Sequence, residues 1–346
     1  MQHWRYYIAE GFPQAAEKIN VIRTGAAAEL QADPSQALET IRPETAVLTL
    51  LAGSGSRWAA SVQAAAEAGI PTGFDTRKPR GLFPVQNLLP SHICNQKSLP
   101  IAAYSLAAVK GLGSHIIMTS GYEREIEQEI LQPLGFQPDT YRFQQQKLFQ
   151  GKPLGHGAAA LQAKPFWENY RYVICNFGGD ANNRQTVKTA LLALAGLDAA
   201  GENTGLLLPA AFIENPAYTI KTDSQGRPIA FHHAKLTGRE QASGRGWSNV
   251  GLRLYRSEDL AEALNQLHKQ YWSSEYGYQV PGNQGNELAL DNADAYLAER
   301  RRARLLAIAQ PEEITPAKTL DAIPGFLHAV SSLPRMRSLT SDKTGV

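Results

Sequence analysis

Residues 46–57 read Ala46-Val47-Leu48-Thr49-Leu50-Leu51-Ala52-Gly53-Ser54-Gly55-Ser56-Arg57, an apolar run followed by a glycine-rich turn. The next stretch, 58–68, is rich in alanine and contains neither Pro nor Gly, and Gly69 and Pro71 follow it. This order is typical of a strand, a tight loop and a helix. The glycines let backbone N–H groups approach an anion, and the helix dipole adds partial positive charge. We therefore expect a phosphate-binding loop in which Arg57 adds a full charge, the alternative being a tight turn that binds nothing.

The loop differs from two common phosphate-binding motifs. It lacks the Lys and Ser/Thr of a P-loop, and the third glycine of a dinucleotide-binding fingerprint falls on Trp58. A second element follows at Lys78-Pro79-Arg80-Gly81-Leu82-Phe83-Pro84-Val85. Together the two elements resemble the signature of the sugar-1-phosphate nucleotidyltransferases, or nucleotide-sugar pyrophosphorylases.

Later segments resemble further motifs of this family, in the family's order. A glutamine run at 143–146 and a glycine-rich stretch at 153–161 are similar to the pair that holds the base in uridylyltransferases. Gly178-Gly179-Asp180 follows an apolar run and resembles the family's metal and phosphate position. The remaining resemblances are a hairpin at 218–229, an Asn-x-Gly strand at 247–255 and an element at 286–291, so that the similarity covers about residues 45–330.

The resemblance implies an enzyme that joins a nucleoside triphosphate, with UTP favoured, to a sugar-1-phosphate and releases pyrophosphate. Mg²⁺ is the implied cofactor, with Asp180 as its ligand, because this hard cation prefers oxygen. The implied catalytic cations are Arg57 and a residue of the second element, where the alignment allows Lys78 or Arg80 and the Lys-Pro form favours Lys78. The nucleotide would be held by Leu51, Ala52, Gly53, Gly55, Ser56, Gln145, Gly155, His156 and Gly157, and the sugar by Tyr218, His233, Asn249 and Gly251.

Several of these residues also have purely structural interpretations. Asp180 can cap a helix or serve as a turn residue, and Asn249 can cap or bridge strands. Gln145 competes with two neighbouring glutamines for one role and can be a solvated side chain at a sheet edge. We expect His156, inside a Gly-x-Gly turn, to position that turn and not to act as an acid or base.

The sequence also departs from the family pattern. Between Arg57 and Lys78 lie 20 residues, which predicts an enlarged loop over the phosphates. Thr219 stands where a glycine is usual, His233 stands near the place of a sugar-contacting glutamate, and no second metal ligand is evident at 317–321. Two alternatives therefore stay open: a catalytically impaired relative that binds a nucleotide or nucleotide-sugar, and a transferase acting on a non-sugar phosphate such as phosphocholine.

Composition favours a cytoplasmic enzyme. The chain has 346 residues, of which 43% are hydrophobic, and a formal net charge of +2. The densest basic run, 299–304, is expected on the solvated face of a helix, so no nucleic-acid partner is expected. Cys94 and Cys175 lie far apart without metal-ligand spacing, which argues against a disulfide framework or a zinc site. We expect no signal peptide and no membrane partner, and the sequence leaves the oligomeric state open.

Strand-like and helix-like runs alternate along the chain, which predicts an α/β fold. We expect a mainly parallel, Rossmann-like nucleotidyltransferase sheet covered by helices, with a small antiparallel sugar-binding lobe. The catalytic domain would span 45–330, after a helical accessory segment at 1–44 and before a loose tail at 331–346. Ligands of such sheets bind beyond the carboxyl ends of the strands, where the glycine loop and Asp180 both lie. Strands are expected at 46–51, 115–119, 141–144, 172–177 and 205–208, helices at 100–110, 124–131 and 186–197, and the lobe at 219–230 and 250–255.

Overall fold

The computed structural model describes residues 34–51, 56–70, 72–89, 91–233, 244–283 and 286–333. Most of the expected accessory segment, the phosphate-loop residues 52–55 and nearly all of the expected tail lie outside these ranges. Of the accessory segment the structure describes helix α3 (Pro34–Ile41) and a 3₁₀ turn (Arg42–Glu44) that leads into the first strand. The division into three regions therefore stays a prediction.

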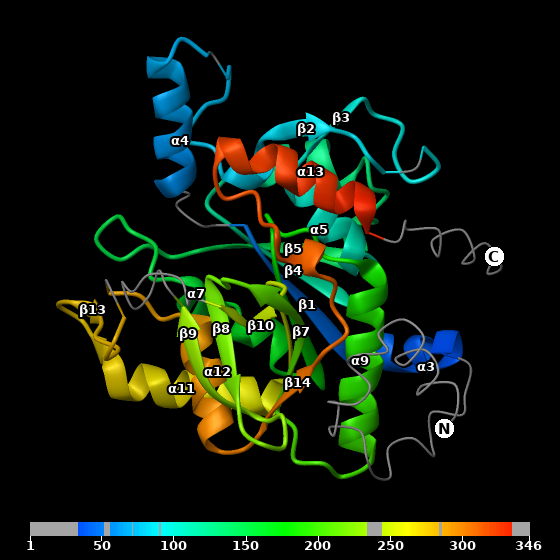
Figure 1. Ribbon diagram of the computed structural model, residues 1–346, viewed down its shortest axis with the longest axis vertical. Helices are drawn as coiled ribbons and strands as arrows, with labels where there is room; N and C mark the ends of the chain where they lie inside the picture. Colours follow the sequence, from blue (N-terminus) through cyan, green and yellow to red (C-terminus); the bar gives the residue numbers. More distant parts are fainter. Residues whose placement is uncertain are drawn as a thin grey trace.

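A mixed sheet of ten strands forms the centre of the described molecule (Figure 1). The strands follow the order β5-β4-β1-β6-β11-β7-β10-β8-β9, and β14 pairs with β7. They are β1 (Thr45–Leu50), β4 (Ser114–Thr119), β5 (Tyr141–Gln145), β6 (Tyr172–Phe177), β7 (Leu206–Glu214), β8 (Tyr218–Thr222), β9 (Pro228–His233), β10 (Arg245–Asn249), β11 (Leu252–Arg256) and β14 (Ala303–Leu306). β1 pairs in parallel with β4 and β6, and β4 with β5, so the expected α/β class and its parallel strands are confirmed.

The other half of this sheet is mainly antiparallel, although β14 pairs in parallel with β7. β8 and β9 form the expected hairpin, and β10 joins β8 to β7, so these strands continue the main sheet. We expected β11 to belong to a separate lobe, but it lies between β6 and β7 and is antiparallel to both. The reason is burial on both faces, because Leu252, Arg253, Leu254 and Tyr255 are all buried. A strand with no exposed face belongs in the middle of a sheet.

Helices cover both faces of the sheet and its upper end (Figure 1). Along β1, Ala46 and Leu48 face a core shared with α7 (His156–Gln162), α8 (Lys164–Trp167), α11 (Ser257–Tyr271) and α12 (Leu290–Glu299). Val47 points to the opposite face and packs with α9 (Arg184–Ala199). This alternation follows from the two-residue period of a strand. Beyond the end of β1, a third core joins α4 (Ser56–Glu67), α5 (Ala102–Val109), α13 (Ile323–Ser332) and the hairpin of β2 (Pro84–Gln86) and β3 (Ser98–Pro100).

The helices expected between the strands are present as α5, as α9, and as α6 (Glu123–Ile126) continued by a π-helical turn (Glu127–Leu131). The expected helix over the basic run 299–304 is wrong, since α12 ends at Glu299 and β14 begins at Ala303. Arg302 pairs with Asp259 and Glu262, so acidic neighbours engage part of this run.

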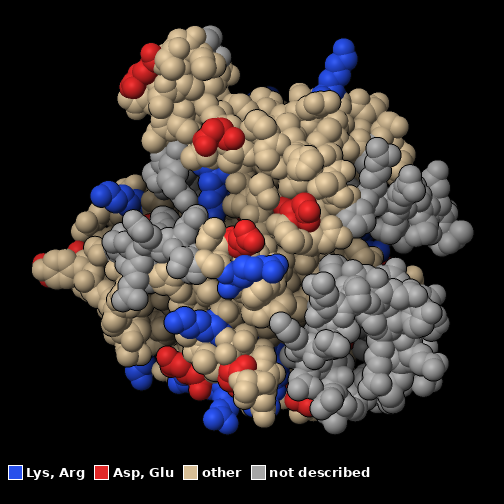
Figure 2. All heavy atoms as spheres, in the orientation of Figure 1, with Lys and Arg blue, Asp and Glu red and all other residues tan. Residues whose placement is uncertain are grey.

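Figure 2 shows side chains of both charges interspersed over the face that it displays. Within the ranges that the structure describes, no helix has the length and apolar character needed to cross a membrane.

A buried carboxylate, Glu313, ties the 3₁₀ turn Pro311–Ile314 to the start of α9. Its oxygens accept hydrogen bonds from the backbone N–H of Asn183 at 3.0 Å, the hydroxyl of Thr186 at 2.8 Å and the backbone N–H of Gln310 at 3.0 Å. Burial raises the pKa of Glu313 from 4.5 to about 7.

This raised pKa makes stability depend on pH. The stabilisation from the protonated carboxyl is fully present below pH 4.5 and is lost as the pH rises through about 7, because the unfolded chain ionises first. Over this window the free energy of unfolding of the wild type should fall by up to about 3 kcal/mol. Glu313→Gln cannot ionise at this position, so its free energy of unfolding should not show this fall. Urea unfolding of both proteins at about pH 5 and about pH 7 measures it. Parallel pH profiles would contradict the assignment.

Candidate active site

The carboxyl ends of β1 and β6 meet at one edge of the sheet, as the sequence predicts. Leu50 pairs with Phe177 in register, and the N–H of Gly178 donates to the carbonyl of Leu50 at 3.3 Å. The side chain of Leu51 fills the space where a Cβ of Gly178 would lie. The predicted loop residues Ala52, Gly53 and Gly55 lie outside the described residues, and of Ser56 and Arg57 only the backbone is described, at the start of α4. Their roles stay predictions.

Arg80, and not Lys78, contacts the segment that carries Asp180. It opens the 3₁₀ turn Arg80–Leu82, and its guanidinium lies against Gly179, where a Cβ would overlap it. Lys78 lies in the turn before, with its N–H donating to the carbonyl of Asp75 at 3.0 Å. The sequence alignment favours Lys78, whereas this geometry favours Arg80 as the cation of the second element.

Asp180 is half-buried and lies just beyond the end of β6. Its carboxylate packs against Gly251, where a Cβ would overlap Oδ2 of Asp180. Gly251 also has a φ of 72°, a backbone conformation that favours glycine. Asp180 is not the N-cap of α9, since that position is Asn183, whose side chain accepts the N–H of Gln185 at 3.0 Å. Asp180 does lie in the turn that follows β6, with its N–H donating to the carbonyl of Phe177 at 3.3 Å, as the turn interpretation expects. Burial raises the pKa of Asp180, and three nearby cations oppose this effect: Lys318, Arg80 and Arg253.

Lys318 is a residue of this site that sequence reasoning missed. The N–H of Ala317 donates to the carbonyl of Gly179 at 3.1 Å, which brings the segment before α13 over the end of β6. Among the charges that lower the pKa of Asp180, that of Lys318 has the largest effect. One sequence feature could have indicated this role: Lys318 lies at 317–321, the segment in which the family pattern has its second metal ligand.

The predicted sugar-binding residues lie on neighbouring antiparallel strands. Trp247 of β10 pairs with Ile220 of β8, and the two strands are antiparallel. Asn249, two residues after Trp247, therefore lies opposite Tyr218, two residues before Ile220, and both side chains are on the same face of the sheet. Tyr218 in turn pairs with His233, whose side chain lies outside what the structure describes.

Asn249 has an unused donor. Its Oδ1 accepts the N–H of Gly251 at 3.2 Å, which links it to the residue that packs against Asp180. Asn249 is 7% exposed, and its buried Nδ2 has no acceptor among the described residues. A buried amide of this kind gains free energy when a ligand oxygen accepts its hydrogen bond.

The glycine-rich stretch expected to hold the base is closely packed against the segment before α12. A Cβ on Gly155, whose φ is 91°, would lie 2.5 Å from the carbonyl oxygen of Leu288, and the N–H of Gly157 donates to that oxygen at 2.8 Å. The ring Nδ1 of His156 accepts the N–H of Leu290 at 2.9 Å. Both glycines and His156 thus have a structural role here, as we expected for the histidine.

The glutamine that touches this stretch is Gln146. Gln145 ends β5 and is exposed, whereas Gln146 is buried and its Nε2 lies 3.3 Å from the carbonyl oxygen of Gly155. Side chains alternate between the faces of a strand, so neighbouring glutamines have different environments. The choice of Gln145 was made among three adjacent candidates, and the contact favours Gln146.

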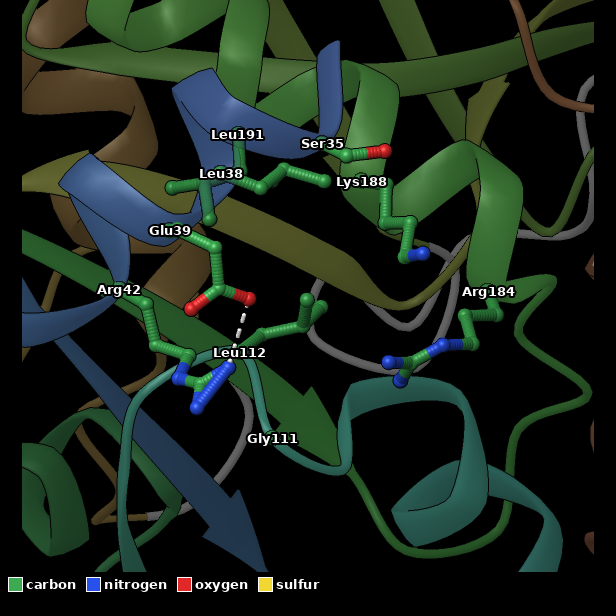
Figure 3. Close-up of a pocket in the computed structure, with 9 residues that line it drawn as sticks. All are labelled: Ser35, Leu38, Glu39, Arg42, Gly111, Leu112, Arg184, Lys188 and Leu191. Atoms are coloured by element: carbon green, nitrogen blue, oxygen red, sulfur yellow. Dashed lines mark hydrogen bonds and ion pairs between the residues drawn. The ribbon is translucent and has the colours of Figure 1, made fainter. Parts of the chain in front are cut away.

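A pocket of about 70 Å³ lies elsewhere, between α3, α9 and the turn at Gly111 and Leu112 (Figure 3). It contains none of the residues predicted for the site. Its cations are engaged by the protein, since Arg42 pairs with Glu39 at 2.9 Å and Arg184 donates to the carbonyl of Lys110 at 2.6 Å. We therefore assign no function to this pocket.

Asp180 is the residue of this site that we consider as a ligand for Mg²⁺. Within the described ranges, no three His, Cys, Asp or Glu side chains are grouped so that they could hold a metal ion. Mg²⁺ is commonly bound by one or two carboxylates together with substrate phosphates. Asp180 fits an ion whose other ligands are phosphate oxygens and waters, and does not fit a metal held by protein side chains alone.

A scan against models of protein families finds no match to this chain, and a search of curated proteins finds none either. The function therefore has to be inferred from the residues of the site and their motifs.

Proposed function

We propose that the protein is a nucleotidyltransferase that joins a nucleoside triphosphate to a sugar-1-phosphate, with UTP preferred. The observation that carries this proposal is the convergence of Asp180, Gly251 and Asn249 at one edge of the sheet. They come from two motifs about 70 residues apart, each of which resembles a motif of the same family. Asp180 and its cationic neighbours suit phosphates, and the unused amide of Asn249 suits a hydroxyl or carbonyl oxygen of a sugar.

The reaction requires two negatively charged phosphates to approach each other, so neutralising charge matters more than covalent catalysis. Arg80 and Lys318 lie beside Asp180 and supply two positive charges at the place where the phosphates would meet. Arg57, at the start of α4, would bind the departing pyrophosphate. Asp180 would hold Mg²⁺, whose chemistry would be charge neutralisation at the reacting phosphate.

A second candidate is a catalytically impaired relative that binds a nucleotide or nucleotide-sugar. The observation that favours it is that, in the part of the chain that the structure describes, no group of three His, Cys, Asp or Glu side chains could hold a metal, while Lys318 lies close to Asp180. Both candidates are proposed to act in the cytoplasm on small molecules, without nucleic acid or membrane.

Pyrophosphate release distinguishes the two candidates. We expect release when Mg²⁺, UTP and a panel of sugar-1-phosphates are supplied, with phosphocholine included as a non-sugar acceptor. Buried polar groups matched to uracil are left unpaired by another base, so ATP and CTP should bind more weakly by about 1–3 kcal/mol, and dTTP should be the closest competitor.

Binding of UTP measured by calorimetry, without turnover for any acceptor, would support the impaired relative and contradict the enzyme. Equal binding of UTP and ATP would contradict the base preference. Gln145→Ala and Gln146→Ala form a matched pair for the base contact, and we expect the change at Gln146 to reduce UTP binding more.

A further inference from the structure

A buried arginine connects the strands and helices that form the candidate site. Arg253 lies on β11, is 3% exposed and pairs in register with Cys175 of β6. Its Nε donates to Oδ2 of Asp294 at 2.7 Å and its Nη2 donates to Oδ1 of Asp291 at 2.6 Å, both on α12. Two charged hydrogen bonds fix the plane of the guanidinium.

The fixed guanidinium contacts two aromatic rings from different strands. It lies 5.3 Å from the ring centroid of Phe177 at the end of β6 and 5.7 Å from that of Tyr218 on β8. Both distances are within the range of a cation–π interaction. Phe177 directly precedes Gly178-Gly179-Asp180, and Tyr218 lies opposite Asn249. Arg253 therefore contacts one ring next to Asp180 in the chain and one ring across the sheet from Asn249.

The same network reaches the glycine-rich stretch. Oδ2 of Asp291 lies 3.7 Å from Nε2 of His156, and the ring of His156 packs edge-on against Phe177 with centroids 5.2 Å apart. Asp294 also accepts the hydroxyl of Tyr255 at 2.5 Å and lies 3.3 Å from the hydroxyl of Tyr218. The charged groups at the centre are thus one guanidinium and two carboxylates, all buried.

We propose that Arg253 is a positioning residue of the candidate site, which sets the rings of Phe177 and Tyr218 and through them the places of Asp180 and Asn249. This inference rests on the proposed function for its catalytic consequence, but the placement of the rings can be measured without it. An uncharged residue could fill the same volume but would not orient the two rings. The guanidinium of Arg253 has one orientation because Asp291 and Asp294 both accept its hydrogen bonds, and each ring packs against that fixed plane.

The conservative change Arg253→Lys tests this role because lysine keeps the charge and loses the planar fork. We expect the KM for the sugar-1-phosphate, which Asn249 would bind, to rise roughly 10- to 100-fold, as for other groups that orient ligand-binding residues. We also expect kcat to fall, because Asp180 would be displaced, while the Kd of UTP measured without metal changes little. Arg304→Lys is the matched control, since Arg304 is also a buried arginine of this sheet, on β14, and its carboxylate partner is Glu202. In the control the KM, the kcat and the Kd should all stay unchanged.

NMR spectra of protein with labelled phenylalanines give a readout independent of turnover, with the Phe177 signal assigned from Phe177→Leu. We expect this signal to shift in Arg253→Lys and to stay in place in Arg304→Lys. Absence of pyrophosphate release in the wild type would reject the proposed function, and the Phe177 signal would still decide the positioning role.

An unmoved Phe177 signal would overturn the inference, as would equal loss of affinity for both substrates. Should Arg253→Lys fail to fold, Asp294→Asn keeps the shape of the network and weakens one arm of the fork. We expect the same pattern from it in KM and in the Phe177 signal.

Discussion

We expect Asp180→Asn to lower kcat for pyrophosphate release at least about 100-fold while the protein stays folded. The substitution keeps the size of the side chain and its packing against Gly251, but it removes the carboxylate that we assign to Mg²⁺. The expected loss therefore falls on turnover. Binding of UTP without metal should be retained or tighter, because the neighbouring cations lose their negative partner.

Stability provides a separate check on the same variant. Burial raises the pKa of Asp180, so the ionised carboxylate disfavours the folded state above the ordinary pKa of an aspartate. Asp180→Asn should therefore melt at the same or a higher temperature than the wild type at neutral pH, which is common for residues kept for function. Asp139→Asn, a change at an exposed carboxylate on another part of the chain, should alter neither quantity. Retained Mg²⁺-dependent turnover in Asp180→Asn would remove Asp180 from the metal position.

The parts of the fold that were predictable are those with strong local patterns. Apolar runs followed by glycines predicted β1 and β6, and because parallel strands end at the same edge, they placed Leu51 near Gly178. The Asn-x-Gly motif predicted a single strand over 247–255, whereas the structure divides this segment at Val250 and Gly251 into β10 and β11, and that break brings Asn249 and Gly251 to this edge. Each of these inferences uses only residues close together in the sequence.

The parts that were not predictable depend on distant contacts. Arg253 is held by Asp291 and Asp294, which lie 38 and 41 residues further along the chain. Charged residues are expected at the surface, so no local pattern marks three of them as buried together. The central place of β11 was missed for the same reason, because its arginine reads as an exposed residue.

Choices between neighbouring residues also needed the structure. Gln145 is the last residue of β5 and is exposed, whereas Gln146 follows it and is buried; Lys78 and Arg80 differ in how the chain turns between them. A one-residue shift in an alignment exchanges such candidates. Lys78 and Arg80 can be compared directly by substituting each of them.

We expect Arg80→Ala to reduce kcat about 100-fold, the usual effect of removing one preorganised donor to a reacting group, and Lys78→Ala to reduce it by less than about 5-fold. The reason is position, because the guanidinium of Arg80 lies against Gly179 beside Asp180, while the backbone of Lys78 is engaged in the preceding turn. Arg80→Lys should recover part of the activity, since lysine supplies the charge without the two parallel hydrogen bonds that a phosphate can accept. Steady-state pyrophosphate release, with melting temperatures as the check on folding, measures all three variants.

A double variant separates two roles that Arg80 could have. If Arg80 served only to balance the charge of Asp180, then Arg80→Ala combined with Asp180→Asn would be no worse than Asp180→Asn alone. Because we assign Arg80 to the phosphates, the combination should lose a further factor in nucleotide affinity, corresponding to about 1.5–3 kcal/mol for a charged hydrogen bond. Equal UTP affinity in the single and double variants, or a greater loss of turnover in Lys78→Ala than in Arg80→Ala, would return the catalytic role to Lys78. In that case the turn that presents Arg80 to Gly179 would serve packing alone, and the Lys-Pro form of the motif would be the correct alignment.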